Sequence, residues 1–99
     1  MSQPYLSVIA EIIAKPGHED EVRKHLIAAV EPTRKEAGCI QYDLHVSTAE
    51  PGHFFFYENW TNLDALKAHS GSAHLKALGA AVGPLVTGPT RVVTCTRIA

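Results

Sequence analysis

The stretch CIQYDLHVSTAEPGHFFFYENW, residues 39–60, contains two alternating segments joined by a short turn. In residues 39–47 every second side chain is apolar or aromatic, and the same holds in 53–60 apart from Glu58, which is typical of strands with one buried face. Residues 49–52, Ala-Glu-Pro-Gly, have the composition of a turn. The stretch therefore predicts an antiparallel hairpin. The side chains expected on its core side are Ile40, Tyr42, Leu44 and Val46 in the first strand and Phe54, Phe56, Glu58 and Trp60 in the second.

The segments before the hairpin predict a strand and a helix. Residues 5–14 are largely apolar in both alternating sets, so this strand is expected at the centre of its sheet. Residues 18–37 follow the 3.6-residue period, with acidic residues in the first turn. Pro32 falls inside this helix, and we expect a kink or a restarted turn there. Gly38 is expected to end the helix.

The segments after the hairpin predict two short helices and a strand. Thr61-Asn62 and Ser72 are capping residues, and they favour helices over 63–69 and 73–82. Residues 90–98 are rich in β-branched types and predict the last strand. In the first of these helices the inward side chains are expected to be Leu63, Leu66 and Ala65.

The resulting order, β-α-β-β-α-β, is the split-βαβ or ferredoxin-like pattern of the α+β class. Right-handed crossovers give one antiparallel four-stranded sheet, in the order 4-1-3-2, with its helices on one face. A chain of 99 residues has a small core, so we expect one domain, residues 5–98, that forms a homodimer through the other sheet face. That face would carry Ile9, Ile13, Phe55, Tyr57 and Val93.

Composition narrows the classes of function. Nine Lys and Arg against ten Asp and Glu give a net charge of −1, without the basic surplus of a nucleic-acid-binding protein. No apolar run reaches the roughly 20 residues that span a bilayer, and no signal peptide is apparent, so we expect a cytoplasmic protein that does not bind membranes. Cys39 and Cys95 would lie on opposite sheet edges, so we expect two free thiols.

Glu58 is the most informative polar residue, because the alternation places it on the core side between Phe56 and Trp60. A carboxylate there loses its hydration, so it must be paired, raised in pKa, or both. It is a candidate catalytic base. A structural ion pair, with Arg34 or a histidine, is the alternative.

His69 and His74 are the next candidates. On an uninterrupted helix they would lie roughly 140° apart. Gly71 and the Ser72 cap would instead put His69 at the end of one helix and His74 at the start of the next, so that both rings could face one cavity. Each is a candidate catalytic proton acceptor or donor, and helix capping or packing is the alternative.

Aromatic side chains on the core side are candidates for substrate binding. Trp60 could stack on a planar bicyclic ligand, and core packing is the alternative. Tyr42 could donate a hydrogen bond to a substrate oxygen, and packing is equally open there. Phe54 and Phe56 would form an apolar wall. We expect no metal site and no nucleotide, flavin or nicotinamide cofactor, because neither ligand spacing nor a glycine-rich phosphate loop occurs.

Four segments form a specific combination: VIAEIIAKPG (8–17), RKEAGCIQYDLHVS (34–47), FYENW (56–60) and ALKAHSGSAHLKAL (65–78). Together they resemble the antibiotic biosynthesis monooxygenase (ABM) family, whose members are small dimeric α+β-barrel proteins and include quinol monooxygenases. The resemblance covers nearly the whole chain. It implies the fold, dimerisation and a pocket between the sheet and the helices.

Comparison within that family narrows the resemblance. Polyketide-quinone oxygenases carry Asn and Tyr where this chain has Phe56 and Leu66, and haem-degrading members carry Asn and a His ligand at the positions of Ala10 and Gly79. The motif YE-x-W followed by two histidines is closer to the menadiol-type quinol monooxygenases. The resemblance therefore implies quinol chemistry without haem.

These observations predict a cofactor-independent monooxygenase that oxidises a quinol or polyphenol with O2. An oxygenase without flavin, haem or metal must take its electrons from the substrate, and a deprotonated quinol can supply them once Glu58 or His69 has removed a phenolic proton. Two alternatives stay open. One is an O2-independent isomerase or degradation enzyme for a small oxygenated metabolite, and the other is a non-catalytic small-molecule-binding stress-response module.

Overall fold

A computed structural model of the chain describes residues 5–99, and a four-stranded antiparallel sheet lies at its centre. The strands are β1 (Leu6–Ile13), β2 (Cys39–Val46), β3 (His53–Trp60) and β4 (Arg91–Cys95), in the order β2-β3-β1-β4. Strand β1 is flanked on both sides, which confirms its expected central place. The last strand is shorter than expected, because β4 stops at Cys95.

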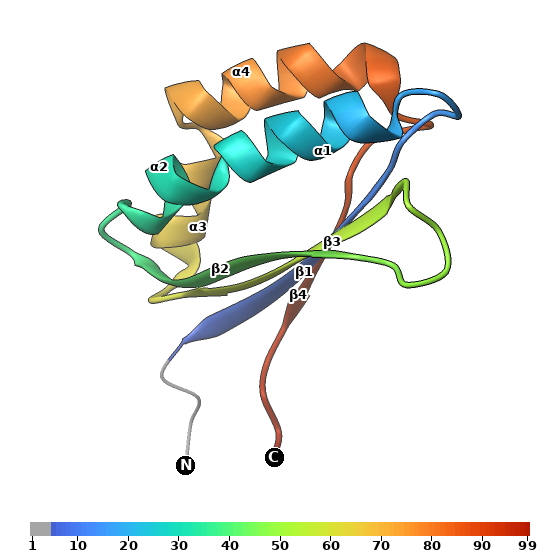
Figure 1. Cartoon of the computed structure of the whole chain (residues 1–99). Helices are drawn as coiled ribbons and strands as arrows, with labels where there is room; N and C mark the ends of the chain where they lie inside the picture. Colours follow the sequence, from blue (N-terminus) through green and yellow to red (C-terminus); the bar gives the residue numbers. More distant parts are fainter. Residues whose placement is uncertain (1–4) are drawn as a thin grey trace.

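Within residues 5–99, four α-helices cover one face of this sheet (Figure 1). They are α1 (Glu19–Ala28), α2 (Val30–Arg34), α3 (Leu63–Ser70) and α4 (Ala73–Val82), and a 3₁₀ turn over Gly83–Leu85 follows. The two expected caps are present. The Asn62 side chain accepts from the Ala65 N–H at 2.9 Å, and Ser72 accepts from the Leu75 N–H at 3.4 Å. The α+β ferredoxin-like fold is therefore confirmed.

The long helix expected over residues 18–37 is divided in two. Helix α1 ends at Ala28 and α2 begins at Val30. The break precedes Pro32 because a proline inside a helix has no N–H to donate and its ring crowds the carbonyl four residues earlier, here that of Ala28. The restarted turn is confirmed, and its position is corrected from Pro32 to Ala29.

The start of β2 departs from simple alternation. The pairing with β3 shifts register between Cys39 and Gln41, so Ile40 is an extra residue in a bulge. Cys39 consequently pairs with Trp60 and packs against the core, whereas Ile40 is 53% exposed. The expectation that Ile40 is buried is wrong for this reason.

Gly38, just before β2, does not end a helix as expected, because α2 already stops at Arg34. The glycine instead allows the chain to pass close to α3, where an added Cβ would collide with Ala65. A second correction concerns Leu63, which is 52% exposed. Leu63 is the first residue of α3 and stays at the surface, whereas Ala65 and Leu66 pack against the core.

The core lies between the helices and one face of the sheet. Alternate side chains of β3 point into it, and each is at most 4% exposed: Phe54, Phe56, Glu58 and Trp60. Val22 and Leu26 of α1 are buried against them. The expected alternation of β3 is therefore confirmed.

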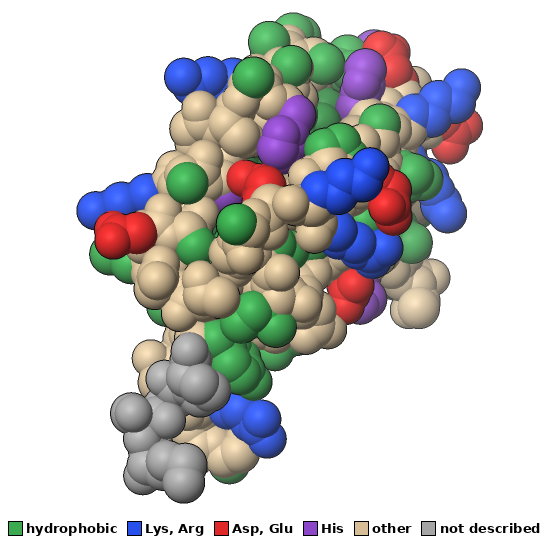
Figure 2. All heavy atoms as spheres, turned by 90° about the vertical axis from the view of Figure 1, so that its left-hand side faces the viewer, with side chains coloured by type: hydrophobic (Ala, Val, Ile, Leu, Met, Phe, Trp, Pro, Cys, Tyr) green, Lys and Arg blue, Asp and Glu red, His purple; other side chains and the backbone are tan. Residues whose placement is uncertain are grey.

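The opposite face of the sheet is partly apolar and open in the single chain. Four of its side chains are between 39% and 43% exposed, namely Ile9, Ile13, Tyr57 and Val93. The two cysteines are free and lie on the opposite edge strands β2 and β4, as expected. Lysines and arginines are interspersed with acidic and histidine side chains on the face shown in Figure 2. No helix within residues 5–99 is long and apolar enough to cross a membrane.

Candidate functional site

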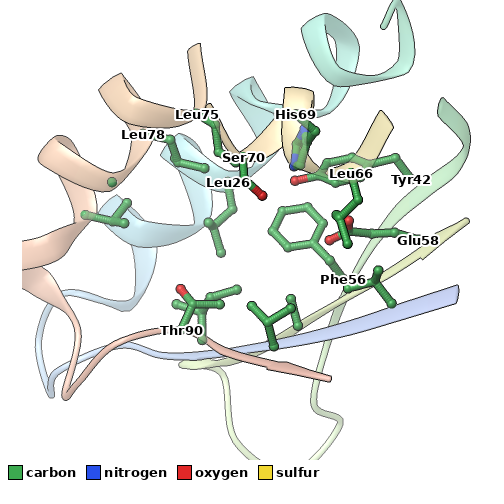
Figure 3. Close-up of a pocket in the computed structure, with 16 residues that line it drawn as sticks. Leu26, Tyr42, Phe56, Glu58, Leu66, His69, Ser70, Leu75, Leu78 and Thr90 are labelled. Atoms are coloured by element: carbon green, nitrogen blue, oxygen red, sulfur yellow. The ribbon is translucent and has the colours of Figure 1, made fainter. Parts of the chain in front are cut away.

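A cavity of about 200 Å³ lies between the helix layer and the sheet (Figure 3). Its walls are mostly apolar and come from all four strands below and from α1, α3 and α4 above. Thr90, just before the edge strand β4, and Val92 on that strand are exposed yet line it, so the cavity is reached from the β4 edge. The polar side chains in its wall are Tyr42, Glu58, His69, Ser70 and Thr90.

Glu58 projects from β3 into this cavity and is 4% exposed. Burial raises its pKa from 4.5 to about 7, with the Trp60 hydrogen bond opposing and the charge of Glu36 adding to the rise. The Trp60 indole N–H donates to Glu58 Oε1 at 2.8 Å. No buried side-chain oxygen in residues 5–99 lacks a partner. Since the bond goes to Oε1, the second oxygen, Oε2, is accessible from the cavity.

Glu58 does not pair with Arg34, because that arginine binds other carboxylates. Arg34 contacts Asp43, with 3.0 Å between Nη2 and Oδ1, and also approaches Glu31 at 3.4 Å. Both contacts lie at the surface, where such pairs contribute little stability. Glu58 is thus hydrogen-bonded to a neutral indole, and within residues 5–99 it forms no ion pair that would compensate its charge.

His69 lies in the last turn of α3, is 4% exposed and lines the same cavity. Its Nδ1 is 2.7 Å from Glu36 Oε2. Its ring lies 4.6 Å from that of Trp60 and 5.5 Å from that of Tyr42, measured between centroids. Burial lowers the pKa of His69, and the bond to Glu36 only partly opposes this. His69 is therefore a neutral imidazole at pH 7.

His74 lies in the first turn of α4, as expected, but outside the cavity wall. Its Nε2 is 3.2 Å from Thr33 Oγ1 and 3.5 Å from Glu36 Oε2. The break between α3 and α4 does bring the two histidines together, with ring centroids 6.2 Å apart. His74 is therefore behind His69, on the side away from the cavity, and shares Glu36 with it.

Two of the four aromatic candidates line the cavity, and the other two do not. Tyr42 and Phe56 line the cavity and stack on each other, with centroids 4.6 Å apart. Burial raises the pKa of the Tyr42 hydroxyl, which therefore stays protonated and can donate. Trp60 is fully buried beneath Glu58 and His69 rather than in the wall. Phe54 lines a separate surface hollow below α1 and α2.

Sequence reasoning missed Glu36, Ser70 and Thr90. Glu36 lies in the connection between α2 and β2, where the sequence pattern predicts the end of a helix and gives no sign of a buried contact. Ser70 and Thr90 reach the cavity through the packing of α3 and β4, which no local spacing encodes. The only available signal for Glu36 was its place inside the EAGC segment.

Within residues 5–99, the side chains of Glu36, His69 and His74 form a group that could hold a metal. Their ligand atoms all lie within 4.8 Å of one another, and two imidazoles with a carboxylate suit Zn²⁺ or Fe²⁺. The 2.7 Å between His69 Nδ1 and Glu36 Oε2 is, however, a hydrogen-bond length. Tetrahedral ligands 2.0–2.1 Å from zinc stand about 3.3 Å apart, so a bound ion would have to separate this pair.

The arrangement places a carboxyl group and a neutral imidazole in one apolar cavity. The pKa of Glu58 is about 7, and the pKa of His69 lies below its usual 6.5. Groups of this kind exchange protons with a bound hydroxyl near neutral pH. Such a pair is therefore a candidate acid–base site.

Comparisons with known proteins agree with the fold. The family model described as "Antibiotic biosynthesis monooxygenase" matches residues 5–81. A Mycobacterium tuberculosis protein named "Putative monooxygenase Rv0793" is 38% identical over 92 residues, which cover 93% of this chain and 89% of that protein. A Bacillus subtilis protein named "Putative monooxygenase YcnE" is 32% identical over 85% of this chain and 88% of its own length.

Among solved structures, PA3566 from Pseudomonas aeruginosa superposes with a TM-score of 0.92 at 32% identity. The match covers 100% of this chain and 99% of that one. The Mycobacterium tuberculosis protein Rv0793 superposes with a TM-score of 0.88 at 34% identity, over 96% of each chain. Sequence and structure thus agree over almost the full chain.

Proposed function

The chain belongs to the antibiotic biosynthesis monooxygenase family, and on this premise we propose that it is a cofactor-independent monooxygenase that oxidises a quinol or related polyphenol with O2. Family membership and the names of the relatives support a monooxygenase-like role. The finer assignment rests on one observation: Glu58 and His69 line one apolar cavity, and each leaves one polar atom unbonded toward it.

The cavity supports a small aromatic substrate. Its volume of about 200 Å³ lies below the roughly 300–1,000 Å³ of sites for drug-sized ligands, which favours one or two fused rings. Phe56 and the ring of Tyr42 offer flat apolar surface, and the Tyr42 hydroxyl can donate to a ring oxygen. Polar groups are few, which suits a substrate with one or two hydroxyls.

The reaction begins with removal of a phenolic proton by His69 or ionised Glu58. In an apolar cavity the phenolate is poorly solvated and more readily gives one electron to O2. The semiquinone and superoxide combine at a ring carbon that bears hydrogen, and loss of water from the peroxide leaves a hydroxyquinone. Quinol and O2 thus become hydroxyquinone and water, and the base returns its proton to the departing oxygen.

The substrate supplies every electron in this scheme. Two come from oxidation of the quinol to the quinone, and two come from hydroxylation of the ring carbon. The absence of a nucleotide- or flavin-binding motif in the sequence favours this arrangement. The protein contributes proton transfer, orientation and exclusion of water.

O2 uptake tests the proposal. Purified, metal-free protein is mixed with chemically reduced menadione, and consumption is compared with autoxidation. We expect catalysed uptake and a hydroxyquinone whose new oxygen comes from ¹⁸O2. His69→Ala should lose the catalysed rate, while His45→Ala, at an exposed position on β2, should keep it. Uptake by the wild type at the autoxidation rate would rule out this function.

An O2-independent acid–base enzyme is the second candidate, because Glu58 and His69 could move protons on a carbonyl compound without O2. Anaerobic incubation with small hydroxy-carbonyl metabolites separates the two. Turnover there, together with no O2 uptake, would favour isomerisation. Tight quinone binding without conversion in either assay would favour the non-catalytic binding module.

We also propose that a second copy of the chain covers the outer face of the sheet. This face leaves Ile9, Tyr57 and Val93 about two-fifths exposed on adjacent strands. A contiguous apolar surface of this kind is unusual on a monomer. Light scattering should give a dimer mass, and Tyr57→Glu should shift it toward the monomer. A monomeric wild type at micromolar concentration would contradict the proposal.

A further inference from the structure

Glu36 is a partly buried acidic residue next to His69 that the proposed reaction leaves unused. Its Oε2 contacts two imidazoles, at 2.7 Å from His69 Nδ1 and 3.5 Å from His74 Nε2. Thr33, which is fully buried, contacts the same His74 nitrogen at 3.2 Å. These residues come from α2, the α2–β2 joint, α3 and α4, so the cluster ties four parts of the helix layer together. Histidine and acidic side chains lie next to one another on that end of the molecule (Figure 2).

We propose that Glu36 is a positioning residue that keeps His69 protonated on Nδ1, with Nε2 free to accept the substrate proton, and that His74 and Thr33 hold Glu36 in place. The proposal rests on the proposed function for the identity of the proton donor. Neither the family description nor the names of the relatives give a role to Glu36, His74 or Thr33.

The tautomer follows from the hydrogen bond. A neutral imidazole carries one N–H, and a carboxylate can only accept, so the proton between His69 Nδ1 and Glu36 belongs to the histidine. Nε2 is then an acceptor. The hydrogen bond of the ring uses Nδ1, and no buried side-chain nitrogen in residues 5–99 lacks a partner. Nε2 is therefore accessible from the cavity that His69 lines (Figure 3).

Charge gives Glu36 a second effect. When His69 accepts a proton it becomes an imidazolium in a buried place, which is costly without an adjacent anion. Glu36 supplies that anion at hydrogen-bond distance. An aspartate acts in the same way on the histidine of serine proteases, orienting the ring and stabilising its charged form without taking the proton.

His74 and Thr33 account for the fixed position of Glu36. The side chain of Glu36 is 19% exposed and that of His74 is 30% exposed, so water can reach them, unlike His69 at 5%. The Nε2 atom of His74 lies within reach of both Glu36 Oε2 and Thr33 Oγ1. The titratable groups around His69 are Glu36, His74 on α4 and Tyr42 on β2, and Tyr42 stays neutral.

The test compares Glu36→Gln with the wild type by ¹⁵N NMR of histidine and by kinetics. We expect His69 to lose its clear Nδ1–H preference and to titrate at lower pH, because Glu36 raises its pKa. With reduced menadione, kcat should fall at least tenfold and by at most the ~10⁴-fold seen when the aspartate of a serine protease is replaced. KM should stay constant, and the acidic limb of the pH–rate profile should move to lower pH.

Glu31→Gln is the matched control, because it removes the same charge from an exposed position on α2. It should leave the His69 tautomer, its titration and kcat unchanged. His74→Ala should give a smaller change in the same direction as Glu36→Gln.

Two results overturn the proposal: an unchanged His69 tautomer and titration in Glu36→Gln, or an unchanged kcat where the wild type turns over. If the wild type consumes no O2, the NMR experiment still decides the positioning of His69, and only the proposed function fails.

Discussion

Glu58 and Asn59 are neighbours on β3, and each is only 4% exposed, yet they lie on opposite faces of the sheet. Asn59 faces outward, where its Oδ1 accepts from Ser7 Oγ at 2.7 Å and its Nδ2 donates to Gln41 Oε1 at 2.7 Å. Gln41 in turn donates to Asp43 at 2.7 Å. These bonds form a chain of polar side chains, Ser7–Asn59–Gln41–Asp43, which connects β1, β3 and β2 on the outer face.

The helix-facing side differs in how its polar atoms are used. Glu58 accepts one hydrogen bond on one oxygen, and His69 uses one of its two nitrogens, while the remaining atoms open to the cavity. A polar group that is satisfied by its neighbours serves stability, whereas a buried group left partly unsatisfied costs stability and is available to a ligand. The comparison predicts that changes on the inner face alter rate and that changes on the outer face alter folding.

The largest effect is expected for Glu58→Gln. The amide keeps an oxygen for the Trp60 indole but cannot exchange a proton with the substrate beside His69, so the rate of quinol oxidation should fall about 10²- to 10⁴-fold. Oxygen uptake and circular dichroism together measure this.

Asp43→Asn is the matched control on the outer face, because it neutralises a carboxylate without changing shape. Its rate should equal that of the wild type. Equal losses in both variants, or none in either, would remove the distinction between the two faces.

The second effect is a pH dependence of stability. Glu58 has a folded pKa near 7 and an unfolded value of 4.5, so the folded state holds an extra proton between these values. Its contribution to the free energy of unfolding therefore falls as pH rises through pH 4.5–7, by about 3 kcal/mol in total. Below pH 4.5 both states are protonated and the slope disappears.

Urea unfolding from pH 4 to 8 measures this, and Glu58→Gln should lack the decline. The lowered pKa of His69 acts in the opposite direction below pH 6.5, so the difference between variant and wild type isolates Glu58. Parallel curves for the two proteins would show that Glu58 is already ionised in the folded protein at low pH.

The third effect is a loss of stability when a polar side chain of the outer face is removed. Asn59→Ala leaves the Ser7 hydroxyl and the Gln41 carboxamide without a shared partner, which should lower the free energy of unfolding by about 1–3 kcal/mol. The rate per folded molecule should not change. Denaturant midpoints and active-site-normalised rates measure the two properties, and a rate loss without a stability loss would contradict the comparison.

Much of the fold could be predicted because its signals are local. The alternation of β3 and the caps Asn62 and Ser72 each act within a few residues, and the structure reproduces them. The bulge at Ile40 could not be predicted, because a single inserted residue leaves the pattern of hydrophobic types unchanged. The helix break was displaced because a proline acts on the carbonyl four residues earlier.

The site could be predicted where a local pattern fixes the direction of a side chain. Glu58 interrupts an apolar face, and parity alone placed it in the cavity wall. Trp60 follows the same parity but lies beneath the wall, because the space above it is occupied by His69. Glu36 meets His69 across 33 residues of sequence, and such a contact exists only after the helices have packed.

The smallest expected effect concerns Gly79, in the middle of α4 and in the cavity wall. A glycine there costs the helix about 0.5–1 kcal/mol relative to alanine, and an added Cβ would meet no atom within 4 Å. Gly79→Ala should therefore stabilise the protein by about that amount in thermal unfolding.

A larger side chain at the same position tests whether the substrate occupies the cavity. Gly79→Leu should regain the helical preference but raise KM for reduced menadione, because its side chain would fill part of the cavity. The control is Ala80→Leu, on the exposed side of α4, which should leave KM unchanged. An unchanged KM in Gly79→Leu would mean that the substrate does not use this cavity, and the unbonded atoms of its polar groups would then need another explanation.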